Sequence, residues 1–367
     1  MEHFDVAVVG GGMVGGAIAY GCALRGARTV MLDEGDIALR AARGNFGLVW
    51  SQSKGLGMPA YAAWTRESLT LWPEFAERMG QAAGQGIGYR RVGGLAFCVG
   101  EEELQERRDR LHNQVGGPAT PVHLLDRKQV DDLLPNAKLG PRVLGASLAP
   151  EDGHVNPLLL LRGLHAGFRQ AGGVHRPGTR VADMQPGFTI TTEDGETIRA
   201  DRVVVAAGLG TPRLAFMLGM DVPVRPVRGQ NMVTERLAPM LPMPASAIRQ
   251  TEEGVVQIGV SEEEGEWEPA TKVSELARMA RRAVEVLPAL AKARVVRSWG
   301  ALRPMTPDAF PAYMQSDRYP GAFAATCHSG VTLSAAHAGP LVDGIMAGSL
   351  PEVVAPLHPA RFHAHAH

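Results

Sequence analysis

Apolar and polar positions at the start of the chain follow a pattern that predicts a strand, a helix and a second strand. An apolar run over residues 4–9 is typical of a buried parallel strand, and a helix is expected over 13–25. A second strand is expected over 29–32 and ends in an acidic pair at 33–34. This order predicts a βαβ unit, in which the helix crosses over between two parallel strands.

Later parts of the chain carry strand patterns of two kinds. The runs at 203–207 and 323–326 are apolar throughout, as in buried parallel strands. The dipeptide Asp194-Gly195 is typical of a hairpin turn, and the segment 222–302 has an antiparallel type of pattern. The individual strands expected from these patterns cover residues 179–185, 188–192, 196–199, 203–207, 294–302 and 323–326.

Helices are expected where apolar positions recur every three or four residues. Aromatic and apolar side chains over 61–79 form such a stripe, with Pro73 as a kink, and we interpret the stripe as core. The pair Asn156-Pro157 predicts a helix start, because asparagine caps a helix and proline suits its first turn. A charged surface helix is expected over 101–115, and a further helix over 273–287.

Length, charge and cysteines limit the class of protein. The 367 residues are enough for two lobes, and the net charge of −1 indicates neither a nucleic acid nor an anionic membrane as partner. Three distant cysteines without a CxxC pair indicate no metal cluster and no disulfide framework, which favours a reducing cytoplasm. The apolar stretch 6–24 contains six glycines and follows no lysine or arginine, so we do not interpret it as a signal peptide or membrane span. The final RFHAHAH is interpreted as a disordered end, not as a metal site.

Glycines at the first strand–helix turn provide the first chemical signal. Gly10-x-Gly12-x-x-Gly15 combines a tight turn, close approach of a pyrophosphate and close packing of helix on strand. The helix N-terminus would face the phosphates, and Asp33 would accept hydrogen bonds from ribose hydroxyls. The pattern therefore predicts an adenine-dinucleotide site, with a glycine-rich loop of an unrelated α/β protein as the alternative.

A second strand–turn–helix arrangement indicates which dinucleotide is bound. The strand over 323–326 is followed by His328-Ser329-Gly330 and by a helix expected to begin near Val331. A helix N-terminus there would stabilise the anionic N1–C2=O edge of a reduced flavin, which a nicotinamide cofactor does not require. The arrangement favours FAD, with an ordinary βα turn and an NAD-dependent dehydrogenase as alternatives.

Six segments in a fixed order resemble one family over nearly the whole chain. They are VVGGGMVGGAIA, EDGHVNP, ADRVVVAAGLGTP, PVRPVRGQ, WGALRPMTPDAFP and CHSGVTL. Together they are similar to the D-amino-acid-oxidase/glycine-oxidase family of FAD-dependent amine oxidoreductases. Within it, RGNFGLVWSQSKGLG and CHSGVTLSAAHAGPL most resemble the β-type subunits of opine oxidases and D-hydroxyproline dehydrogenases.

The resemblance implies a combined α/β and α+β architecture with two discontinuous domains. A doubly wound, Rossmann-like FAD-binding domain would consist of residues 1–55, 150–215 and 300–367. A substrate-binding domain with an antiparallel sheet would consist of residues 56–149 and 216–299. The predicted strand types agree with this division, since the runs of the parallel type fall in the first set.

Arg303, in the segment ALRPMTPD, matches the family position that binds a substrate carboxylate. A guanidinium binds a carboxylate through two parallel hydrogen bonds and so orients the Cα–H bond toward flavin N5. A structural pair with Asp308 is the alternative. Arg249 is a second candidate for a carboxylate and would suit an opine, whereas Arg228 is expected to hold a loop.

Three further residues are expected beside the flavin. His328 is a catalytic candidate that would hold the substrate amine neutral, bind substrate or brace the turn. Lys54 and Gln52 lie in the loop that the family places beside the flavin and the substrate pocket. Lys54 would contact substrate or stabilise flavin charge, with a solvated loop lysine as the alternative.

The resemblance also implies the residues that hold the cofactor, with the backbone of Val181 against the adenine. These residues are Gly10, Gly12, Met13, Val14, Gly15, Asp33, Glu34, Arg43, Gly44, Asn45, Val181, Ala207, Gly208, Arg303, Ser329, Gly330, Val331 and Thr332. Some relatives attach flavin through a cysteine where this chain has Trp299-Gly300-Ala301-Leu302, so noncovalent FAD is expected. No metal site is predicted.

The implied function is FAD-dependent oxidation of an amino acid or secondary amine, such as D-hydroxyproline or an opine. A hydride would pass from Cα to flavin N5, and the imine product would be hydrolysed. The alternative is a flavin-holding scaffold or electron-transfer subunit that is active only with its partner. β-Type subunits work with a larger α subunit and a small iron–sulfur subunit, and some hold FMN at the interface. A cytoplasmic location is therefore expected, with partners that link the chain to the inner face of the membrane as a further option.

Overall fold

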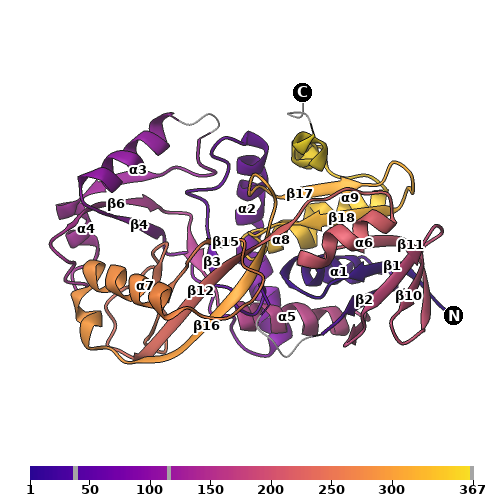
Figure 1. The fold of residues 1–367 in the computed structure, drawn as a ribbon, viewed down its shortest axis with the longest axis horizontal. Coiled ribbons are helices and arrows are strands. Elements are labelled where there is room, and N and C mark those ends of the chain that lie inside the picture. Colours follow the sequence, from indigo (N-terminus) through magenta and orange to yellow (C-terminus); the bar gives the residue numbers. More distant parts are fainter. Residues whose placement is uncertain (36–39, 114–116, 364–367) are drawn as a thin grey trace.

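The computed structural model describes residues 1–35, 40–113 and 117–363 and folds them into two lobes (Figure 1). One lobe contains a mainly parallel sheet with helices, and the other contains antiparallel sheets with their own helices. This arrangement confirms the predicted combination of a doubly wound part with an antiparallel part. Each lobe is assembled from segments that lie far apart in the sequence.

The parallel sheet has its strands in the order β17–β18–β11–β1–β2–β8. In that order, the strands are Ala312–Gln315, Ala322–Thr326, Thr197–Val205, Glu2–Val9, Thr29–Asp33 and Val174–Pro177. All neighbours in this row are parallel except β17 and β18. The predicted parallel strands at 4–9, 203–207 and 323–326 are confirmed. Their continuous apolar character reflects helices on both faces of the sheet.

β11 joins two strands that the sequence pattern separates. β9 (Val181–Gln185) and β10 (Thr189–Thr192) form the predicted antiparallel ribbon, which turns at Asp194-Gly195 into β11. β11 then runs unbroken from Thr197 to Val205, pairing with β10 near its start and with β1 along its length. The polar residues between its two apolar parts stay in the strand because β1 pairs with them.

Helices cover both faces of this sheet. α1 (Met13–Leu24) and α5 (Pro157–Gln170) pack on one face in a shared apolar core, and α6 (Thr211–Met217) packs on the other. α5 begins where it is predicted to begin. The side chain of Asn156 accepts hydrogen bonds from the N–H groups of Leu158 and Leu159, which satisfies two of the free donors at the helix start.

The long helix α2 (Pro59–Ala83) shares the core of α1 and α5. Its aromatic stripe is buried there, and the indole N–H groups of Trp64 and Trp72 donate to Tyr313 and to the carbonyl of Thr332. The interpretation of the stripe as core is confirmed. The proposed boundary at residue 56 places this helix in the substrate-binding domain, but its packing joins it to the parallel-sheet lobe.

The second lobe contains a five-stranded antiparallel sheet centred on β12 (Arg225–Arg236), with α7 (Val273–Val286) packed on one face. The other strands of the sheet are β13 (Ile248–Gln250), β14 (Val255–Gly259), β15 (Glu263–Glu264) and β16 (Val295–Met305). β16 continues beyond its predicted end at residue 302 because β12 pairs with it as far as Met305. Arg303 therefore lies inside the sheet, and the domain boundary proposed at residue 300 falls too early.

A smaller sheet completes this lobe. It consists of β4 (Gly94–Val99), β6 (Val143–Ala149) and β5 (His123–Asp126), with α3 (Glu101–Asn113) and α4 (Arg127–Leu133) beside it. The end of the charged helix predicted over 101–115 lies outside the described residues. No strand of this small sheet is among the strands expected from the sequence.

Shorter elements complete the fold. They are β3 (Leu48–Val49), β7 (Gly153–His154), η1 (Gly208–Gly210), η2 (Pro288–Lys292), α8 (Ser334–Ala336), η3 (His337–Leu341), α9 (Val342–Ala347), η4 (Glu352–Leu357) and η5 (Pro359–Phe362). Within the described ranges, no helix has the length and apolar character needed to cross a membrane. Residues 364–367 of the RFHAHAH end lie outside the described part.

Candidate active site

The first strand–helix turn has the geometry of a phosphate cradle. Gly10 has φ 110°, and a Cβ there would lie 2.3 Å from the carbonyl oxygen of Ala206. A Cβ at Gly15 would lie 1.9 Å from the carbonyl oxygen of Gly10, so both glycines are required by packing. At Gly12 the nearest protein atom to such a Cβ is 3.7 Å away, on Ala42. Gly12 is therefore not required by packing within the chain, which fits the approach of a ligand to its backbone.

The acidic end of β2 lies directly beside this turn. Asp33 accepts hydrogen bonds from the N–H groups of Gly11, at 2.5 Å, and Gly35, at 2.8 Å. Glu34 pairs with Arg180, with 2.9 Å between Oε2 and Nε, at the start of the β9 ribbon. Val181 is buried on β9, and its carbonyl accepts from Arg213 Nη2 at 2.9 Å. The expected ribose and adenine residues are thus brought together at one edge of the parallel sheet.

The loop after β2 is fastened to the antiparallel sheet. The carbonyl of Gly44 accepts from Trp299 Nε1 at 3.1 Å and from Asn231 Nδ2 at 3.3 Å. Asn45 Oδ1 accepts from the N–H of Gly47 at 2.7 Å, which closes a tight turn. Arg43 belongs to the same loop. These contacts hold the predicted flavin-side loop between the two lobes.

The turn after β18 packs on the start of α1. A Cβ at Gly330 would lie 3.1 Å from the Cβ of Met13, so the predicted flavin turn and the phosphate turn are neighbours. The carbonyl of Thr332 accepts from Trp72 Nε1 at 2.8 Å and from Ser68 Oγ at 2.7 Å. α2 therefore fixes this turn in place.

The helix expected to begin near Val331 begins later, at Ser334. Residues 330–333 form a turn in which the N–H of Leu333 donates to the carbonyl of Ser329 at 3.0 Å. The prediction of the helix start is wrong by three residues, because the contacts of α2 with Thr332 hold the chain in this turn. Ala207 and Gly208 directly follow β11, which lies between β18 and β1 in the sheet. They therefore belong to the same edge of the sheet.

Lys54, His328 and Arg303 converge beside these turns. Lys54 Nζ lies 3.2 Å from His328 Nε2. Burial lowers the pKa of His328 well below its usual value, with further contributions from the charges of Lys54 and Arg303. Burial also lowers the pKa of Lys54 to about 8. Two cationic side chains and a neutral imidazole therefore share one site, although they come from residues 54, 303 and 328.

The guanidinium of Arg303 is aimed by the backbone of the segment that follows β14. Its Nη2 donates to the carbonyl of Ser261 at 2.5 Å, and its Nη1 lies 3.3 Å from the carboxylate of Glu262. The Glu262 side chain is 74% exposed, whereas that of Arg303 is 19% exposed. Asp308 instead takes Arg361, at 2.7 Å, so the alternative of an Arg303–Asp308 pair is wrong.

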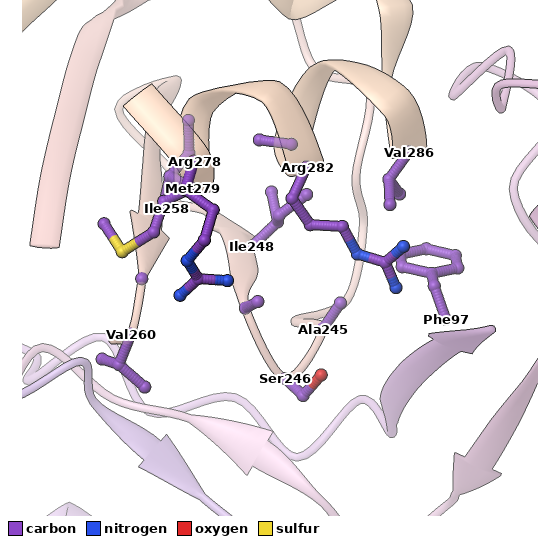
Figure 2. A pocket seen from close by; sticks show the side chains of 13 residues that line it. Phe97, Ala245, Ser246, Ile248, Ile258, Val260, Arg278, Met279, Arg282 and Val286 are labelled. Carbon is purple, nitrogen blue, oxygen red and sulfur yellow. The ribbon is translucent and has the colours of Figure 1, made fainter. Parts of the chain in front are cut away.

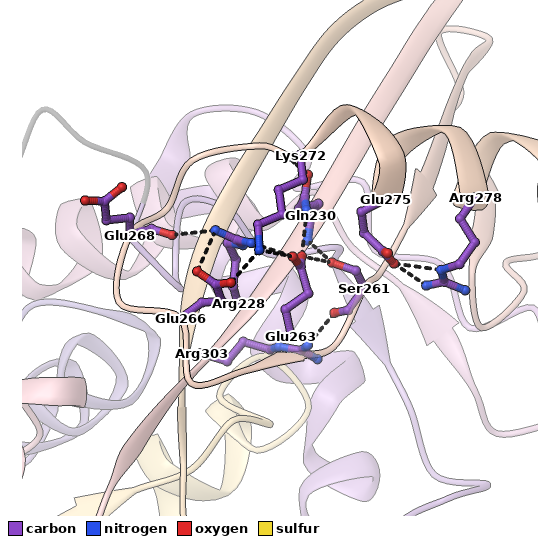
Figure 3. Close-up of polar contacts among 10 residues, drawn as sticks. All are labelled: Arg228, Gln230, Ser261, Glu263, Glu266, Glu268, Lys272, Glu275, Arg278 and Arg303. Carbon is purple, nitrogen blue, oxygen red and sulfur yellow. Dashed lines mark hydrogen bonds and ion pairs between the residues drawn. The ribbon is translucent and has the colours of Figure 1, made fainter.

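Arg228 of β12 follows Val227, the residue that pairs with Arg303, so the two arginine side chains lie on opposite faces of the sheet. Arg228 contacts the same segment after β14 from its own face (Figure 3). It is buried and pairs with Glu263, with 2.5 Å between Nη2 and Oε2. Glu263 in turn accepts from Ser261 Oγ at 2.8 Å, and Ser261 is the residue whose carbonyl orients Arg303. The contacts agree with the loop-holding role that the sequence suggests for Arg228.

Arg249 is not brought to the Lys54–His328–Arg303 group. Its Nη2 and Nε donate to Gln257 Oε1, at 2.8 and 3.0 Å, and its Nη1 donates to the carbonyl of Val155 at 3.2 Å. Burial lowers its pKa to about 10. Because protein acceptors occupy most of its donors, the structure does not support Arg249 as a second carboxylate site next to Arg303.

The side chain of Gln52 is also engaged in hydrogen bonds with other parts of the protein. It is fully buried, donates to Asp152 Oδ2 at 3.0 Å and to the carbonyl of Gly94 at 3.1 Å, and accepts from Ser147 at 2.6 Å. Its hydrogen-bonding capacity is largely used, so its expected role as a substrate contact is not supported. It supports the loop that carries Lys54.

Three residues of the site are absent from the sequence predictions. Tyr61, Asp152 and Glu262 contact Ser329, Ser51 and Arg303 respectively. Asp152 lies in the segment EDGHVNP, whose family likeness is the only local signal for it. In the sequence, Tyr61 is one more member of an aromatic stripe, and Glu262 is part of a charged loop.

A separate cavity lies on the α7 side of the antiparallel sheet (Figure 2). Arg278 and Arg282 of α7 point into it, and Phe97, Ser246 and Val260 line its far side. Both arginines are ion-paired, with Glu275 and with Glu103. None of Lys54, Arg303 and His328 lines this cavity.

Comparisons with known proteins show the family to which the chain belongs. The family model described as FAD dependent oxidoreductase matches residues 5–343. The chain belongs to this FAD-dependent oxidoreductase family. It is 39% identical to an opine oxidase subunit of Agrobacterium tumefaciens (strain Ach5) and 39% identical to the corresponding one of Rhizobium meliloti, over 99% of each chain in both cases.

Among solved structures, the glycine oxidase of Geobacillus kaustophilus superposes with a TM-score of 0.86, at 26% identity and 98% coverage of both chains. The fold is therefore that of the family, and the cofactor is FAD. The residues that would hold it are the glycines of the first turn, Asp33, the loop 43–47 and the turn 327–333. The lack of close protein contacts at Gly12 and the uncapped start of α1 fit its pyrophosphate.

Gly12 provides a test of this cradle. Gly12→Ala is expected to fold with little change in thermal stability when FAD is removed, because the added methyl would make only an ordinary contact with Ala42, at 3.7 Å. It should weaken FAD binding by about 10- to 100-fold, since that methyl stands where the pyrophosphate approaches. Fluorescence titration of the apoprotein with FAD measures this. Gly15→Ala is the matched comparison and should destabilise the fold itself, whereas equal FAD affinity in Gly12→Ala and the natural protein would contradict the assignment.

Proposed function

We propose that this FAD-dependent amino-acid oxidoreductase oxidises an N-substituted amino acid, with an opine or D-hydroxyproline as the favoured substrates. The observation that carries the proposal is the convergence of Arg303 and Lys54 on one site beside the predicted flavin turn. The likeness to the two opine oxidase subunits over the full length supports a secondary-amine substrate.

Arg303 would bind the substrate carboxylate. Its guanidinium is rigidly aimed by the Ser261 carbonyl, and Glu262 is the exposed partner that a substrate carboxylate would displace. A charge-assisted, two-point contact fixes the orientation of Cα. Holding two reactants in the correct geometry in this way supplies a large part of an enzyme's rate acceleration. FAD, when bound, accepts the hydride that leaves Cα.

His328 would keep the polar side of the site neutral and oriented. Burial and the nearby cations lower its pKa, so it is an uncharged hydrogen-bonding group at neutral pH. Its Nε2 faces Lys54, at 3.2 Å, and the hydroxyl of Ser329, at 3.4 Å. A neutral imidazole there accepts hydrogen bonds without adding a third positive charge.

Partners belong to the same proposal. The relatives named as opine oxidase subunits support a multisubunit enzyme. Within it, the proposed partners are a larger α subunit and a small iron–sulfur subunit, with FMN at an interface as an option. Electrons would then leave to partners, and a cytoplasmic complex at the inner face of the membrane would suit a respiratory acceptor.

The test is the visible spectrum of the purified protein during anaerobic addition of single amino acids and opines. Bleaching of the oxidised flavin band by one compound would identify the substrate and the reaction class together. A yellow protein that none of the opines, hydroxyproline isomers or other amino acids bleaches, alone or with an artificial acceptor, would instead support the flavin-holding scaffold subunit.

A further inference from the structure

A continuous row of polar groups leads from the substrate site into the core. Lys54 Nζ lies 3.2 Å from His328 Nε2, which lies 3.4 Å from Ser329 Oγ, and that hydroxyl lies 2.6 Å from Tyr61 Oη. Lys54 is the member of the row at the open end. The residue is half-buried, and no carboxylate of the described residues contacts it in an ion pair.

The substrate class creates a chemical requirement at this place. A secondary amino acid is protonated on nitrogen at neutral pH, but loss of hydride from Cα needs the nitrogen lone pair to form the C=N bond. A base must therefore take one proton from the bound substrate before the hydride leaves. The carboxylate clamp of Arg303 brings the substrate nitrogen into the region that Lys54 and His328 share.

We propose that Lys54 is the base that deprotonates the substrate ammonium group, with His328 holding its amine in place. The inference rests on the proposed function. One N–H of the neutral Lys54 amine donates to His328 Nε2, which leaves the nitrogen lone pair to accept the proton. The ammonium proton passes to Lys54, giving a neutral amine and a Lys54 ammonium, and charge is conserved.

The remaining steps balance with the groups already named. With FAD bound, the Cα–H bond would break with its electron pair, FAD would accept the hydride, and the nitrogen lone pair would form the C=N bond of an iminium. Water then cleaves the iminium to an amine and a 2-oxo acid. The proton on Lys54 leaves to solvent when the product departs, and the flavin's electron acceptor restores the oxidised cofactor.

The electrostatics of the site make Lys54 easier to deprotonate than an ordinary lysine. Burial is the main cause that lowers the pKa of Lys54 to about 8, and the charge of Arg303 lowers it further. Cys327, Asp152 and Glu262 act in the opposite direction. The neutral His328 carries no negative charge that would stabilise the Lys54 ammonium group. The Tyr61 ring is also near, with its centroid 6.0 Å from Lys54 Nζ. The neutral fraction of Lys54 therefore increases as pH rises through about 8.

Neighbouring groups are less suited to this role. His328 has a pKa lowered well below its usual value, so it is a weak base. Burial raises the pKa of Tyr61, so its hydroxyl stays protonated. Glu262 is exposed and contacts Arg303. Among these side chains, Lys54 has the proton affinity closest to that of an amine substrate.

The first experiment measures the titration of Lys54 without any substrate. The FAD-containing protein is acetylated with a neutral reagent at a series of pH values, and the modified peptides are quantified by mass spectrometry. Lys54 is expected to reach half of its maximal reactivity near pH 8. Lys128, exposed on α4, serves as the internal reference for reagent activity and peptide recovery at each pH.

The second experiment measures anaerobic flavin reduction against pH with the compound that bleaches the flavin. Lys54→Met and Lys54→Arg are both expected to slow reduction by about 100-fold at pH 7, and both should lose the rise through pH 8. Lys128→Met should behave like the natural protein. A slow Lys54→Arg is decisive, because arginine keeps the positive charge but does not deprotonate.

Two results would overturn the proposal. One is half-maximal reactivity of Lys54 only at about pH 10, the usual range of a lysine side chain. The other is a Lys54→Arg variant that reduces its flavin within a few-fold of the natural rate, which would make the role purely electrostatic. If no compound bleaches the flavin, the proposed function fails, yet the acetylation profile still decides whether Lys54 titrates as a base.

Discussion

Arg303→Ala is expected to lower kcat/KM for a carboxylate substrate by about 100- to 1000-fold while FAD content stays unchanged. The guanidinium is 19% exposed, is held by the carbonyl of Ser261 and faces a carboxylate only weakly, at 3.3 Å from Glu262. It is thus oriented in advance for an incoming carboxylate. Steady-state kinetics with an artificial electron acceptor measures the loss.

Two further variants make this prediction specific. Arg303→Lys keeps the charge but loses the planar fork, so it should recover only a small part of the activity. Arg297→Ala changes an exposed arginine on the same strand, β16, and should leave the kinetics unchanged. If Arg303→Ala retains its KM for the carboxylate substrate, the assignment of the clamp is wrong.

Asp152 is expected to make the stability of the protein depend on pH in an unusual direction. Its carboxylate is fully buried and accepts hydrogen bonds from Ser51 N and Oγ, each at 2.5 Å, and from Gln52 Nε2 at 3.0 Å. No cationic side chain of the described residues pairs with it. Burial raises its pKa from 3.8 to about 6, although these hydrogen bonds partly oppose that shift.

The sign follows from proton binding. Between pH 3.8 and about 6 the folded protein holds a proton on Asp152 that the unfolded chain has lost. Lower pH therefore stabilises the fold through this group, and the contribution is lost as pH rises through about 6. Relative to Asp152→Asn, which does not titrate, the natural protein should gain about 1 kcal/mol between pH 7 and pH 5, and about 2 kcal/mol by pH 4.

Urea unfolding of both proteins with excess FAD at each pH measures this difference. Because other titrating groups are common to the two proteins, they cancel in the comparison. Asp308→Asn is a suitable control, since Asp308 is paired with Arg361 at the edge of the fold and lies outside the Ser51–Gln52 loop. A difference between the natural protein and Asp152→Asn that stays constant with pH would show that Asp152 is already ionised in the folded protein at pH 5.

The same network links stability to the active site. Ser51 and Gln52 precede Lys54 on one loop, and Asp152 holds both of them. Asp152→Asn keeps one acceptor but places an amide donor opposite Gln52 Nε2. A shifted loop should therefore lower the rate of flavin reduction without lowering FAD content, which separates a positioning role from loss of fold.

Local patterns along the chain were sufficient for the cofactor half of the protein. The βαβ unit, its glycines, Asp33 and the capped start of α5 depend on strand and helix periodicity and on backbone conformation, which act over a few residues. The aromatic stripe of α2 was correctly interpreted as core, because a helix face with four large apolar rings is most simply buried. Family likeness added Arg303 and the loop that carries Lys54.

Only the tertiary structure decided where some elements of both lobes begin and end. The helix after β18 starts at Ser334 because α2 holds Thr332, and β16 extends to Met305 because β12 pairs with it. Both depend on partners in distant segments of the chain, which spacing between neighbouring residues does not encode.

The sequence by itself determined that the chain begins with a glycine turn of the dinucleotide-binding type, and its family likeness singled out Arg303 as a candidate for a carboxylate. The tertiary structure decided which polar residues share the site. It brought Lys54 to His328 and Arg303, and it engaged Gln52 and Arg249 with protein partners. The reason is physical: a buried polar side chain binds whichever donor or acceptor the fold places beside it, and that neighbour comes from another segment of the chain.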